Sequence, residues 1–330
     1  MKLLVLIQGH EIAASRYRIL QYLPYLKDNG VSADVMEFPN TIMEYVGLYA
    51  KLDQYESVFV QRKRFHFPFL GLFRHKAKRI IYDLDDAVMY RNSLAGSPYS
   101  RTRQRRFEKM ARACDAIIAG NSFLMELSLP YNSNVTLIPT SIPTSRYSLK
   151  DYSRPRDIVT IGWIGDHGSI HYLESMKDVF DEVAKLHPGK VELKIICDVF
   201  FDCETMPVRK VSWSSETEVD ELKDCDIGIM PLRDDPWSRG KCGLKILQYF
   251  GVGIPVVCTP VGVNRDVVHS GENGYWACNN MEWVDALSKL IDDAGQRRIL
   301  GIAGRKILED RYTVETNSSL ILEVIKGSNS

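Results

Sequence analysis

Several features that would place this chain of 330 residues in a special class are missing from its sequence. Lys and Arg number 42 and so do Asp and Glu, so no net charge favours nucleic acid or a membrane surface. No apolar run reaches about 18 residues, the length that a membrane-spanning helix needs. The run Leu3 to Ile7 is followed at once by polar residues, which is typical of a first strand rather than of a signal peptide. These absences, with ordinary hydrophobic and charged contents of 45% and 25%, favour a soluble globular protein.

Cysteine is sparse and its spacing excludes familiar frameworks. The seven cysteines are odd in number and none form a CxxC pair, which argues against a disulfide scaffold or a zinc site. Several lie in apolar, strand-like runs. We therefore expect reduced, buried thiols and a cytoplasmic location.

What the sequence does contain is an alternation of apolar runs and helical patterns. Near-continuous Val, Ile and Leu runs are typical of parallel strands that are buried on both faces. The expected strands are 3–8, 33–38, 57–61, 79–83, 116–119, 135–139, 158–164, 191–197, 208–211, 226–231, 255–258 and 274–277. The expected helices include 15–28, 102–113, 170–186, 216–223 and 282–290, with two closing helices in 295–325. This order predicts an α/β protein with two open, doubly wound sheets, divided at the Ser-, Pro- and Arg-rich residues 144–157.

The stretch WSRGKCGLKILQYFGVGIPVVC (237–258) is the most informative of the chain. A basic, glycine-containing loop leads into a helical pattern, and a helix N-terminus attracts anions through its unpaired N–H groups and its dipole. We expect Lys241, Lys245 and Gln248 to share one helix face, where they would suit a diphosphate followed by a hydroxylated ring. The alternative is that these lysines lie on a solvated face.

A second candidate phosphate loop is IGWIGDHGS (161–169), a strand followed by a glycine-rich turn and a helix that starts near Ile170. Gly165 and Gly168 would let backbone amides approach a phosphate closely, and Ser169 could cap the helix. A plain tight turn is the alternative.

The order of these motifs resembles glycosyltransferase family 4, the retaining enzymes of the GT-B fold. The second half contributes VSWSSETEVDELKDCDIGIMPL (211–232), RGKCGLKILQYFGVGIPVV (239–257), PVGVNRDVV (260–268) and ENGYW (272–276). The first half contributes SRYRILQYLPYLKDNG (15–30), YDLDDA (82–87), AGNSFL (119–124) and VTLIPTSIPTSRY (135–147). The resemblance implies two Rossmann-like domains facing a central cleft, with residues 1–150 on the acceptor side. Residues 151–310 would bind a nucleotide-sugar donor, and a helix in 311–330 would pack back on the first domain.

This sequence departs from the family's pattern at two glutamates separated by seven residues. Gly240 and Gln248 stand at those positions, so an amide would face the ribose and the first carboxylate has no replacement. We infer that Lys241 and Lys245 carry the diphosphate charge in the transition state. The other residues expected at the donor are Asp166, His167, Asp198, Trp213, Glu218, Cys242, Gly243 and Leu244. Trp213 could instead plug the sheet edge, and Asp198 could cap a helix.

In the first half, one glycine, Gly9, follows the first strand, which is far less than a GxGxxG fingerprint and makes a dehydrogenase the least favoured enzyme. Arg16 could reach the diphosphate or be solvated. DLDDA (83–87) resembles the Asp-x-Asp of metal-dependent glycosyltransferases. We expect instead that Asp85 orients an acceptor hydroxyl, with helix capping as the alternative, and that neither a metal nor another cofactor is needed.

Residues 62–112 are strongly basic, with fourteen Lys and Arg against four Asp and Glu. Within them FHFPFLGLF (65–73) is apolar, so the segment 62–79 could touch an anionic membrane peripherally. The alternative is a solvated loop beside a buried aromatic cluster. No nucleic-acid module accompanies the charge, and we expect no such partner.

Together these observations predict a metal-independent retaining hexosyltransferase of polysaccharide biosynthesis. It would move a sugar from a UDP-, GDP- or ADP-sugar to a hydroxyl of a glycan or lipid-linked glycan. Two alternatives remain open. A sugar-nucleotide epimerase of the same fold would need no acceptor, and a non-catalytic scaffold would bind nucleotide sugar through a degenerate site.

Overall fold

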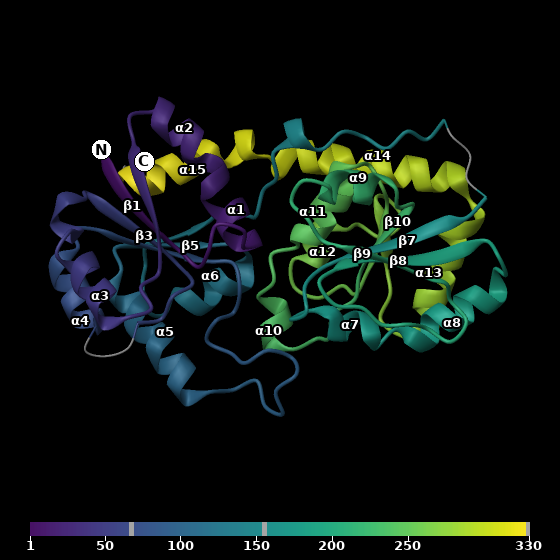
Figure 1. The fold of residues 1–330 in the computed structure, drawn as a ribbon, viewed down its shortest axis with the longest axis horizontal. Coiled ribbons are helices and arrows are strands. Elements are labelled where there is room, and N and C mark those ends of the chain that lie inside the picture. The colour runs from purple at the N-terminus through teal and green to yellow at the C-terminus, as the bar shows by residue number, and fades with distance from the viewer. Residues whose placement is uncertain (66–68, 154–156, 328–330) are drawn as a thin grey trace. The chain divides into compact units, whose positions relative to one another are not determined.

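Each half of the chain forms its own six-stranded parallel sheet in the computed structural model, which describes residues 1–65, 69–153 and 157–327 (Figure 1). The first sheet has the strand order β2-β1-β3-β4-β5-β6. Its strands are β1 (Lys2–Ile7), β2 (Ser32–Glu37), β3 (Ser57–Gln61), β4 (Ile80–Leu84), β5 (Ala116–Ala119) and β6 (Val135–Leu137). The order doubles back beside β1, as in a doubly wound fold.

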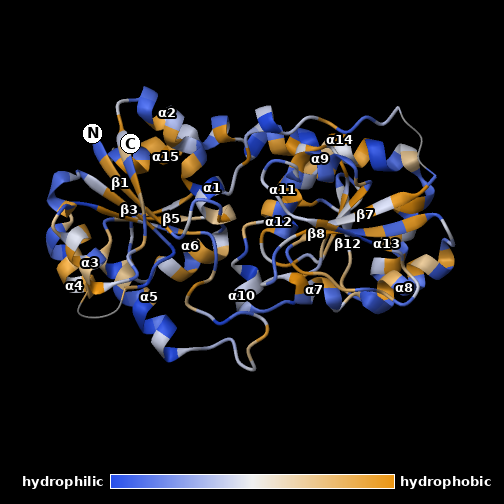
Figure 2. Cartoon of the chain, viewed as in Figure 1, coloured by the Kyte–Doolittle hydropathy of each residue, from blue (hydrophilic) through white to orange (hydrophobic). Residues whose placement is uncertain are grey.

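The second sheet has the order β12-β11-β10-β7-β8-β9. Its strands are β7 (Val159–Ile164), β8 (Val191–Cys197), β9 (Val208–Ser212), β10 (Ile227–Met230), β11 (Val256–Cys258) and β12 (Gly274–Trp276). In both sheets the strands are mostly apolar, as Figure 2 shows by colour. The twelve strands expected from the apolar runs are confirmed, with ends that shift by one or two residues.

The chain divides into two compact units, and each unit consists of more than one segment of the sequence. Unit 1 comprises Met1–Ser141, Asp235–Cys242 and Val314–Ser330, and unit 2 comprises Ile142–Asp234 and Gly243–Thr313. The first crossing lies close to the expected boundary at residue 150, and the final helix counts with unit 1. The short segment Asp235–Cys242 clusters with unit 1, although the sequence placed it among residues 151–310.

Helices cover both faces of the sheet in unit 1. Alternate residues of each strand face opposite sides, so Leu4 and Leu6 join one apolar cluster while Leu3 and Val5 join the other. The helices on the first face are α3 (Ile42–Tyr49), α4 (Phe69–Lys76), α5 (Arg101–Ala113) and α6 (Ser122–Ser128). Those on the second face are η1 (Leu20–Tyr22), α2 (Leu23–Asp28) and α15 (Val314–Lys326), and α1 (Ala13–Arg18) precedes η1.

Unit 2 packs α8 (Lys177–Leu186) and α13 (Asn280–Asp292) on one side of its sheet around Phe180, Leu193 and Leu287. Gly304 of α14 (Ala294–Arg311) lets that helix approach the Phe250 ring of α11 (Leu244–Gly251). The remaining elements are α7 (Ile170–Glu174), α9 (Glu218–Lys223), α12 (Asn264–Val267) and η3 (Thr144–Arg146) in unit 2, and η2 (Leu52–Gln54) and α10 (Pro236–Arg239) in unit 1. The two closing helices are thus confirmed as α14 and α15.

Three parts of the sequence-based expectations fall on residues 66–68, 154–156 and 328–330, which lie outside the described residues. They belong to the apolar segment 65–73, the break at 144–157 and the last helix region. Among the helices that the structure describes, none combines the length and the apolarity needed to cross a bilayer.

Candidate functional site

The glycine-rich loop of unit 2 follows β7 and is closed by its own side chains. The Ser169 hydroxyl donates to Asp166 Oδ1 at 2.9 Å, and the Ser169 amide donates to the Asp166 carbonyl at 2.9 Å. A Cβ on Gly165 would lie 2.2 Å from the Trp163 ring, so this glycine makes room for the indole. Ser169 precedes α7, as expected, but its side chain makes no capping hydrogen bond to the helix.

His167 and Asp198 meet where β7 and β8 end. The His167 Nδ1 lies 2.7 Å from Asp198 Oδ2, and both side chains are exposed, by 76% and 54%. Hydrogen bonding to Asp198 and its charge, with a smaller contribution from Asp166, raise the pKa of His167 above its usual value. The pair therefore offers an exposed imidazole, whose protonated form Asp198 stabilises, at the carboxyl ends of the strands, where open α/β sheets bind ligands. The helix-capping alternative for Asp198 is not what its side chain does here.

Helix α11 begins with a glycine in place of a capping side chain. Gly243 has φ +72°, a left-handed conformation that favours glycine, and no side chain caps this helix. By contrast, side chains cap α3, α5, α6, α10, α13 and α14. The first amides of α11, from Leu244 and Lys245, therefore lie at a helix N-terminus that the N-cap residue does not cap with a side chain.

Lys245 lies half-buried in the first turn of α11, with its Nζ 5.3 Å from the centroid of the Trp163 ring. A cation over an aromatic face is held in position without losing its charge. Gly165, Trp163 and Lys245 thus connect the loop after β7 to the start of α11 within unit 2.

A buried polar network lies behind this surface and was only partly foreseen. Gln248 Nε2 donates to the Tyr147 hydroxyl at 3.2 Å, and that hydroxyl lies 3.5 Å from Glu218 Oε1. The indole N–H of Trp213 donates to Glu218 Oε2 at 3.1 Å, and Arg146 forms an ion pair with the same carboxylate. Gln248 and Glu218 are almost fully buried.

Gln248, expected at the ribose, and Glu218, expected at the donor, thus bond to other side chains of unit 2. Both side chains are committed to the interior, and Trp213 is fixed by its N–H bond to Glu218. Tyr147, which joins the network, was not singled out from the sequence. It ends the motif VTLIPTSIPTSRY, and its place in that motif was the signal available.

The segment Asp235–Cys242 is attached to unit 1 through Asn121. The Asn121 side chain caps α6 by accepting from the Leu124 amide, and its Nδ2 donates to the carbonyls of Arg239 and Lys241 at 3.2 and 3.0 Å. The motif AGNSFL thus contains an anchor for a segment that is more than one hundred positions away in the sequence.

Two glycines allow this segment to pack closely. A Cβ on Gly240 would lie 2.4 Å from Ala87 Cβ and 2.6 Å from the Ala87 amide nitrogen. A Cβ on Gly120 would lie 2.4 Å from Cys242 Sγ. The Cys242 side chain packs against the core of unit 1, and burial raises the pKa of its thiol. Gly240 therefore leaves no room for the glutamate that the family resemblance would place there.

This packing also corrects the expectation of one helix face shared by Lys241, Lys245 and Gln248. Helix α11 starts at Leu244, so Lys241 precedes it and belongs with unit 1. Its Nζ lies 5.7 Å from the centroid of the Trp237 ring. Neither Lys241 nor Cys242 lies on α11 beside Lys245.

The carboxylates of DLDDA are paired with arginines of unit 1. Buried Asp83 forms an ion pair with buried Arg18 at 2.7 Å, and Arg18 also donates to the Ile138 carbonyl. Arg62 contacts Asp85 with two nitrogens and Asp86 with a third at 2.9 Å. Burial acts to raise the pKa of Asp85, but the charge and hydrogen bonds of Arg62 outweigh it, so that pKa lies below its usual value.

Arg62 adopts a left-handed conformation, with φ +52°, which is unusual for a residue with a side chain. This strained backbone directs the guanidinium to the two carboxylates at the end of β4. In the part of the chain that the structure describes, no group of three or more His, Cys, Asp and Glu side chains is arranged to hold a metal ion.

The remaining two residues singled out in the first half lie near the end of β1. Gly9 follows this strand, and a Cβ there would approach only the flexible Ile12 side chain, at 3.3 Å. Arg16 of α1 is half-buried, with its guanidinium carbon 5.2 Å from the centroid of the Tyr17 ring. Both therefore lie at the carboxyl end of the first sheet, within unit 1.

Comparison with known proteins agrees with this architecture. Residues 159–293, most of which lie in unit 2, match the family model described as glycosyl transferases group 1. A search of curated proteins finds no match.

Solved structures extend the likeness to the whole chain. HepE from Anabaena, in complex with UDP and glucose, has 14% sequence identity and a TM-score of 0.73, covering 99% of each chain. Sucrose-phosphate synthase from Thermosynechococcus elongatus has 12% identity and a TM-score of 0.76, covering 99% of this chain and 98% of the other. A glycosyltransferase from Rickettsia africae has 12% identity and a TM-score of 0.72, covering 100% and 99%. The fold is therefore GT-B.

Proposed function

We propose that the protein is a glycosyltransferase that moves a hexose from a nucleotide diphosphate sugar to an acceptor hydroxyl, with retention at the anomeric carbon. The observation that carries the proposal is the start of α11, which has a glycine N-cap, no capping side chain and Lys245 in its first turn. In the transition state the leaving diphosphate gains negative charge. Amides and a cation that are already in place stabilise that charge without reorganising.

The loop after β7 supplies the second part of the proposed donor site. Protonated His167 would add a positive charge near the diphosphate, and Asp198 would hold its ring. A uridine diphosphate sugar is the donor that we propose to test first. One HepE structure contains UDP and glucose, and another contains UDP-glucose.

The finer parts of the proposal rest on chemistry and on the family resemblance. The acceptor is proposed to be a glycan or lipid-linked glycan in polysaccharide biosynthesis. Lys245, His167 and the amides at the start of α11 would neutralise the charge for which other enzymes use a metal, so we propose metal-independent catalysis. None of the seven cysteines forms a disulfide, which supports a reducing, cytoplasmic location. A peripheral contact with an anionic membrane is also proposed.

Slow hydrolysis of UDP-glucose without acceptor, together with thermal shifts by UDP, tests the donor function. The change Lys245→Ala should weaken UDP binding by about tenfold, which corresponds to about 1.4 kcal/mol. Lys289→Ala is the matched control, because Lys289 also lies over an aromatic ring of unit 2, that of Tyr275. Equal loss in both variants would contradict a role for Lys245.

A non-catalytic scaffold is the second candidate, favoured by the burial of Gln248 and Glu218 and by the steric need for Gly240. A nucleotide at 100 times its Kd should stabilise the folded protein by about 2.7 kcal/mol in either case. The scaffold would be favoured if the protein binds UDP-glucose but neither hydrolyses it nor transfers glucose to any glycan of a panel.

A further inference from the structure

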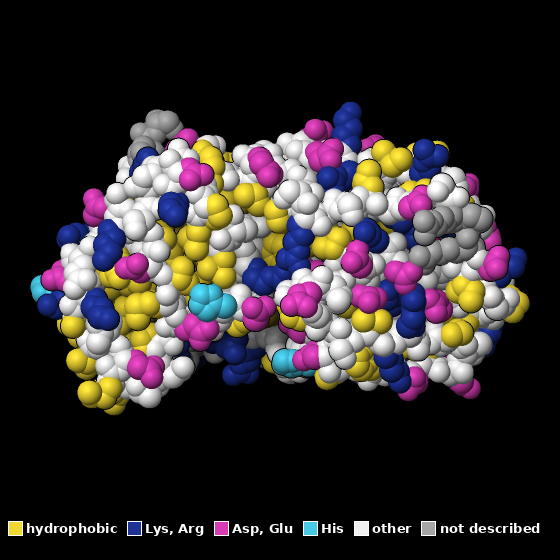
Figure 3. Space-filling model, turned by 45° about the horizontal axis from the view of Figure 1, so that its top comes forward, with side chains coloured by type: hydrophobic (Ala, Val, Ile, Leu, Met, Phe, Trp, Pro, Cys, Tyr) yellow, Lys and Arg dark blue, Asp and Glu magenta, His cyan; other side chains and the backbone are white. Residues whose placement is uncertain are grey.

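The outer face of α3, α4 and α5 in unit 1 combines exposed apolar side chains with a cluster of cations. The α3 side chains of Ile42, Met43 and Val46 are 73%, 79% and 57% exposed. On α4, Leu72 is also exposed. Figure 3 shows apolar side chains beside Lys and Arg on the N-terminal part of the molecule, at the left of that view.

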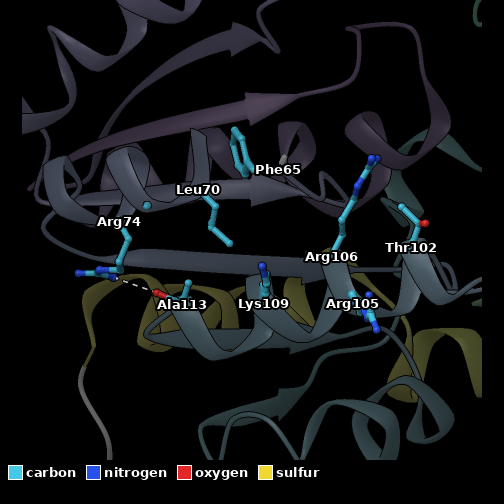
Figure 4. A pocket seen from close by; sticks show the side chains of 9 residues that line it. Phe65, Leu70, Arg74, Thr102, Arg105, Arg106, Lys109 and Ala113 are labelled. Atoms are coloured by element: carbon cyan, nitrogen blue, oxygen red, sulfur yellow. Dashed lines mark hydrogen bonds between the residues drawn. The ribbon is translucent and has the colours of Figure 1, made fainter. Parts of the chain in front are cut away.

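These three helices form one layer. Their inner sides, with Leu48, Leu70 and Phe107, pack into the same apolar cluster on the sheet. The Tyr45 and Phe69 rings join α3 to α4 at 5.2 Å, and Arg74 of α4 donates to the Ala113 carbonyl of α5 at 3.3 Å (Figure 4). Since the inner sides share one core, the outer sides share one surface.

Helix α5 supplies most of the charge on this surface. It contains six Lys and Arg and one carboxylate, Glu108, which accepts from the Tyr131 hydroxyl. Among the residues that the structure describes, no hydrogen bond or ion pair engages the side chains of Arg105 and Arg106. Burial lowers the pKa of neighbouring Arg64, and repulsion by Arg103 and Arg106 lowers it further, so an anion here would relieve an accumulation of cations.

A cavity of about 650 Å³ lies between α4 and α5. Its lining includes Phe65, Leu70, Arg105, Arg106 and Lys109, and contains no carboxylate. In Figure 4, Leu70 points from α4 toward α5, while Arg106 and Lys109 extend from α5 toward the cavity. The cavity is therefore a cationic recess with an apolar wall, of a size that holds a phosphate group and several carbon atoms.

We propose that this face of unit 1 binds the surface of an anionic lipid bilayer. Ile42, Met43 and Val46 would enter the boundary between headgroups and acyl chains, and the cavity between α4 and α5 would hold a lipid phosphate. This proposal extends the proposed function by giving a place where the enzyme would meet a lipid-linked acceptor. Binding to vesicles needs no donor chemistry, so each can fail without the other.

The structure also revises the segment expected to touch the membrane, residues 62–79. Phe65, Leu70 and Phe73 are buried in the core, so they cannot enter a bilayer while the unit stays folded. The apolar contact moves to α3, which carries no Lys or Arg and was not singled out from the sequence.

Co-sedimentation with vesicles tests the proposal. The full chain should bind vesicles that contain phosphatidylglycerol and phosphatidylcholine, lose binding at high salt, and bind pure phosphatidylcholine poorly. The variant R105Q/R106Q/K109Q should bind about 100-fold more weakly, from roughly fivefold per charge near an anionic surface. The variant I42S/M43S/V46S should lose at least about tenfold.

Matched controls lie on unit 2. R298Q/K185Q/K190Q removes three exposed cations there, and L186S/I299S/I302S removes three exposed apolar side chains. Both controls should bind like the unaltered protein, and all four variants should hydrolyse UDP-glucose normally without vesicles if the donor proposal holds. If a control loses as much vesicle binding as its partner variant, the proposal that this face binds the membrane is wrong.

Two measurements on the unaltered protein keep the proposal falsifiable if a variant fails to fold. Hydrogen exchange on anionic vesicles should slow in residues 42–49 and 101–113. Slowing confined to other segments, or equal binding to neutral vesicles, would overturn the proposal. Glycerol phosphate should compete only weakly, and full competition by this soluble phosphate would identify a small-molecule site instead of a bilayer contact.

Discussion

Gly240 shows how a single residue can decide what a site contains. Its Cα faces Ala87 so closely that any Cβ would meet the backbone of the first unit's DLDDA motif. Backbone atoms cannot move aside as the end of a flexible side chain can. The absence of a carboxylate at this position is therefore required by packing, and the chemistry must be carried by other groups.

The change Gly240→Ala should destabilise unit 1 by about 1–3 kcal/mol, the cost of overpacking a close contact. Urea unfolding measures this loss. Gly168→Ala is the control, because its Cβ would lie 3.4 Å from the nearest atom, Asp166 Oδ1, at ordinary contact distance. Equal stability of the two variants would show that the segment 235–242 adjusts freely.

His167 should titrate above the usual range of a histidine. Its raised pKa means that the imidazolium persists to higher pH, so any contribution to UDP binding is complete at low pH and is lost as pH rises through that pKa. Asp198→Asn should lower the pKa of His167, which NMR of the ring protons measures. His167→Gln should flatten the pH dependence of UDP affinity. An unchanged His167 titration in Asp198→Asn would contradict the pairing.

At the scale of helices and strands, the sequence was most informative where burial is continuous. Strands such as β5 and β11 are apolar from end to end because both faces of a parallel sheet are covered, so their positions could be predicted. The short helices α3 and α6 were not singled out, because two turns give too little periodicity. The start of α11 was misplaced because Gly243 adopts a left-handed conformation that the helical spacing of lysines does not reveal.

Tertiary contacts at the candidate site could not be predicted from the sequence. Gln248 and Glu218 have the chemistry of ligand-binding groups. In the structure both instead form hydrogen bonds with the Tyr147 hydroxyl, which lies between them. The attachment of residues 235–242 to unit 1 likewise depends on Asn121, more than one hundred positions earlier. Spacing along the chain carries no information about such partners.

The double role of Asn121 leads to a prediction about α6 and the segment 235–242. Asn121→Ala removes the α6 cap and two hydrogen bonds to this segment, so the free energy of unfolding should fall by about 2–3 kcal/mol. Hydrogen exchange should also quicken in residues 239–242. Asn279→Ala, which removes the cap of α13, should cost about 1 kcal/mol and leave that segment unchanged. Equal costs would mean that Asn121 acts only as a cap.

At the scale of the whole molecule, the last helix, α15, completes the core of unit 1. Helix α15 places Ile321 and Ile325 in the apolar cluster beside β1 and β3, and the Ile325 carbonyl accepts from Ser57 and Arg79. Unit 2 has a separate core around Leu193 and Leu287. Substitutions in the core of α15 should therefore destabilise the sheet of unit 1 and leave the sheet of unit 2 unchanged.

Ile321→Ala and Ile325→Ala should each cost unit 1 about 2–5 kcal/mol, as expected for truncation of a buried aliphatic side chain. Hydrogen exchange followed by mass spectrometry should show faster exchange in β1, β3 and α2, while β7, β8 and α13 keep their protection. Leu287→Ala should give the reverse pattern. If either change loosened both sheets equally, the two cores would unfold as one cooperative body. UDP protection of unit 2 would then depend on the integrity of α15.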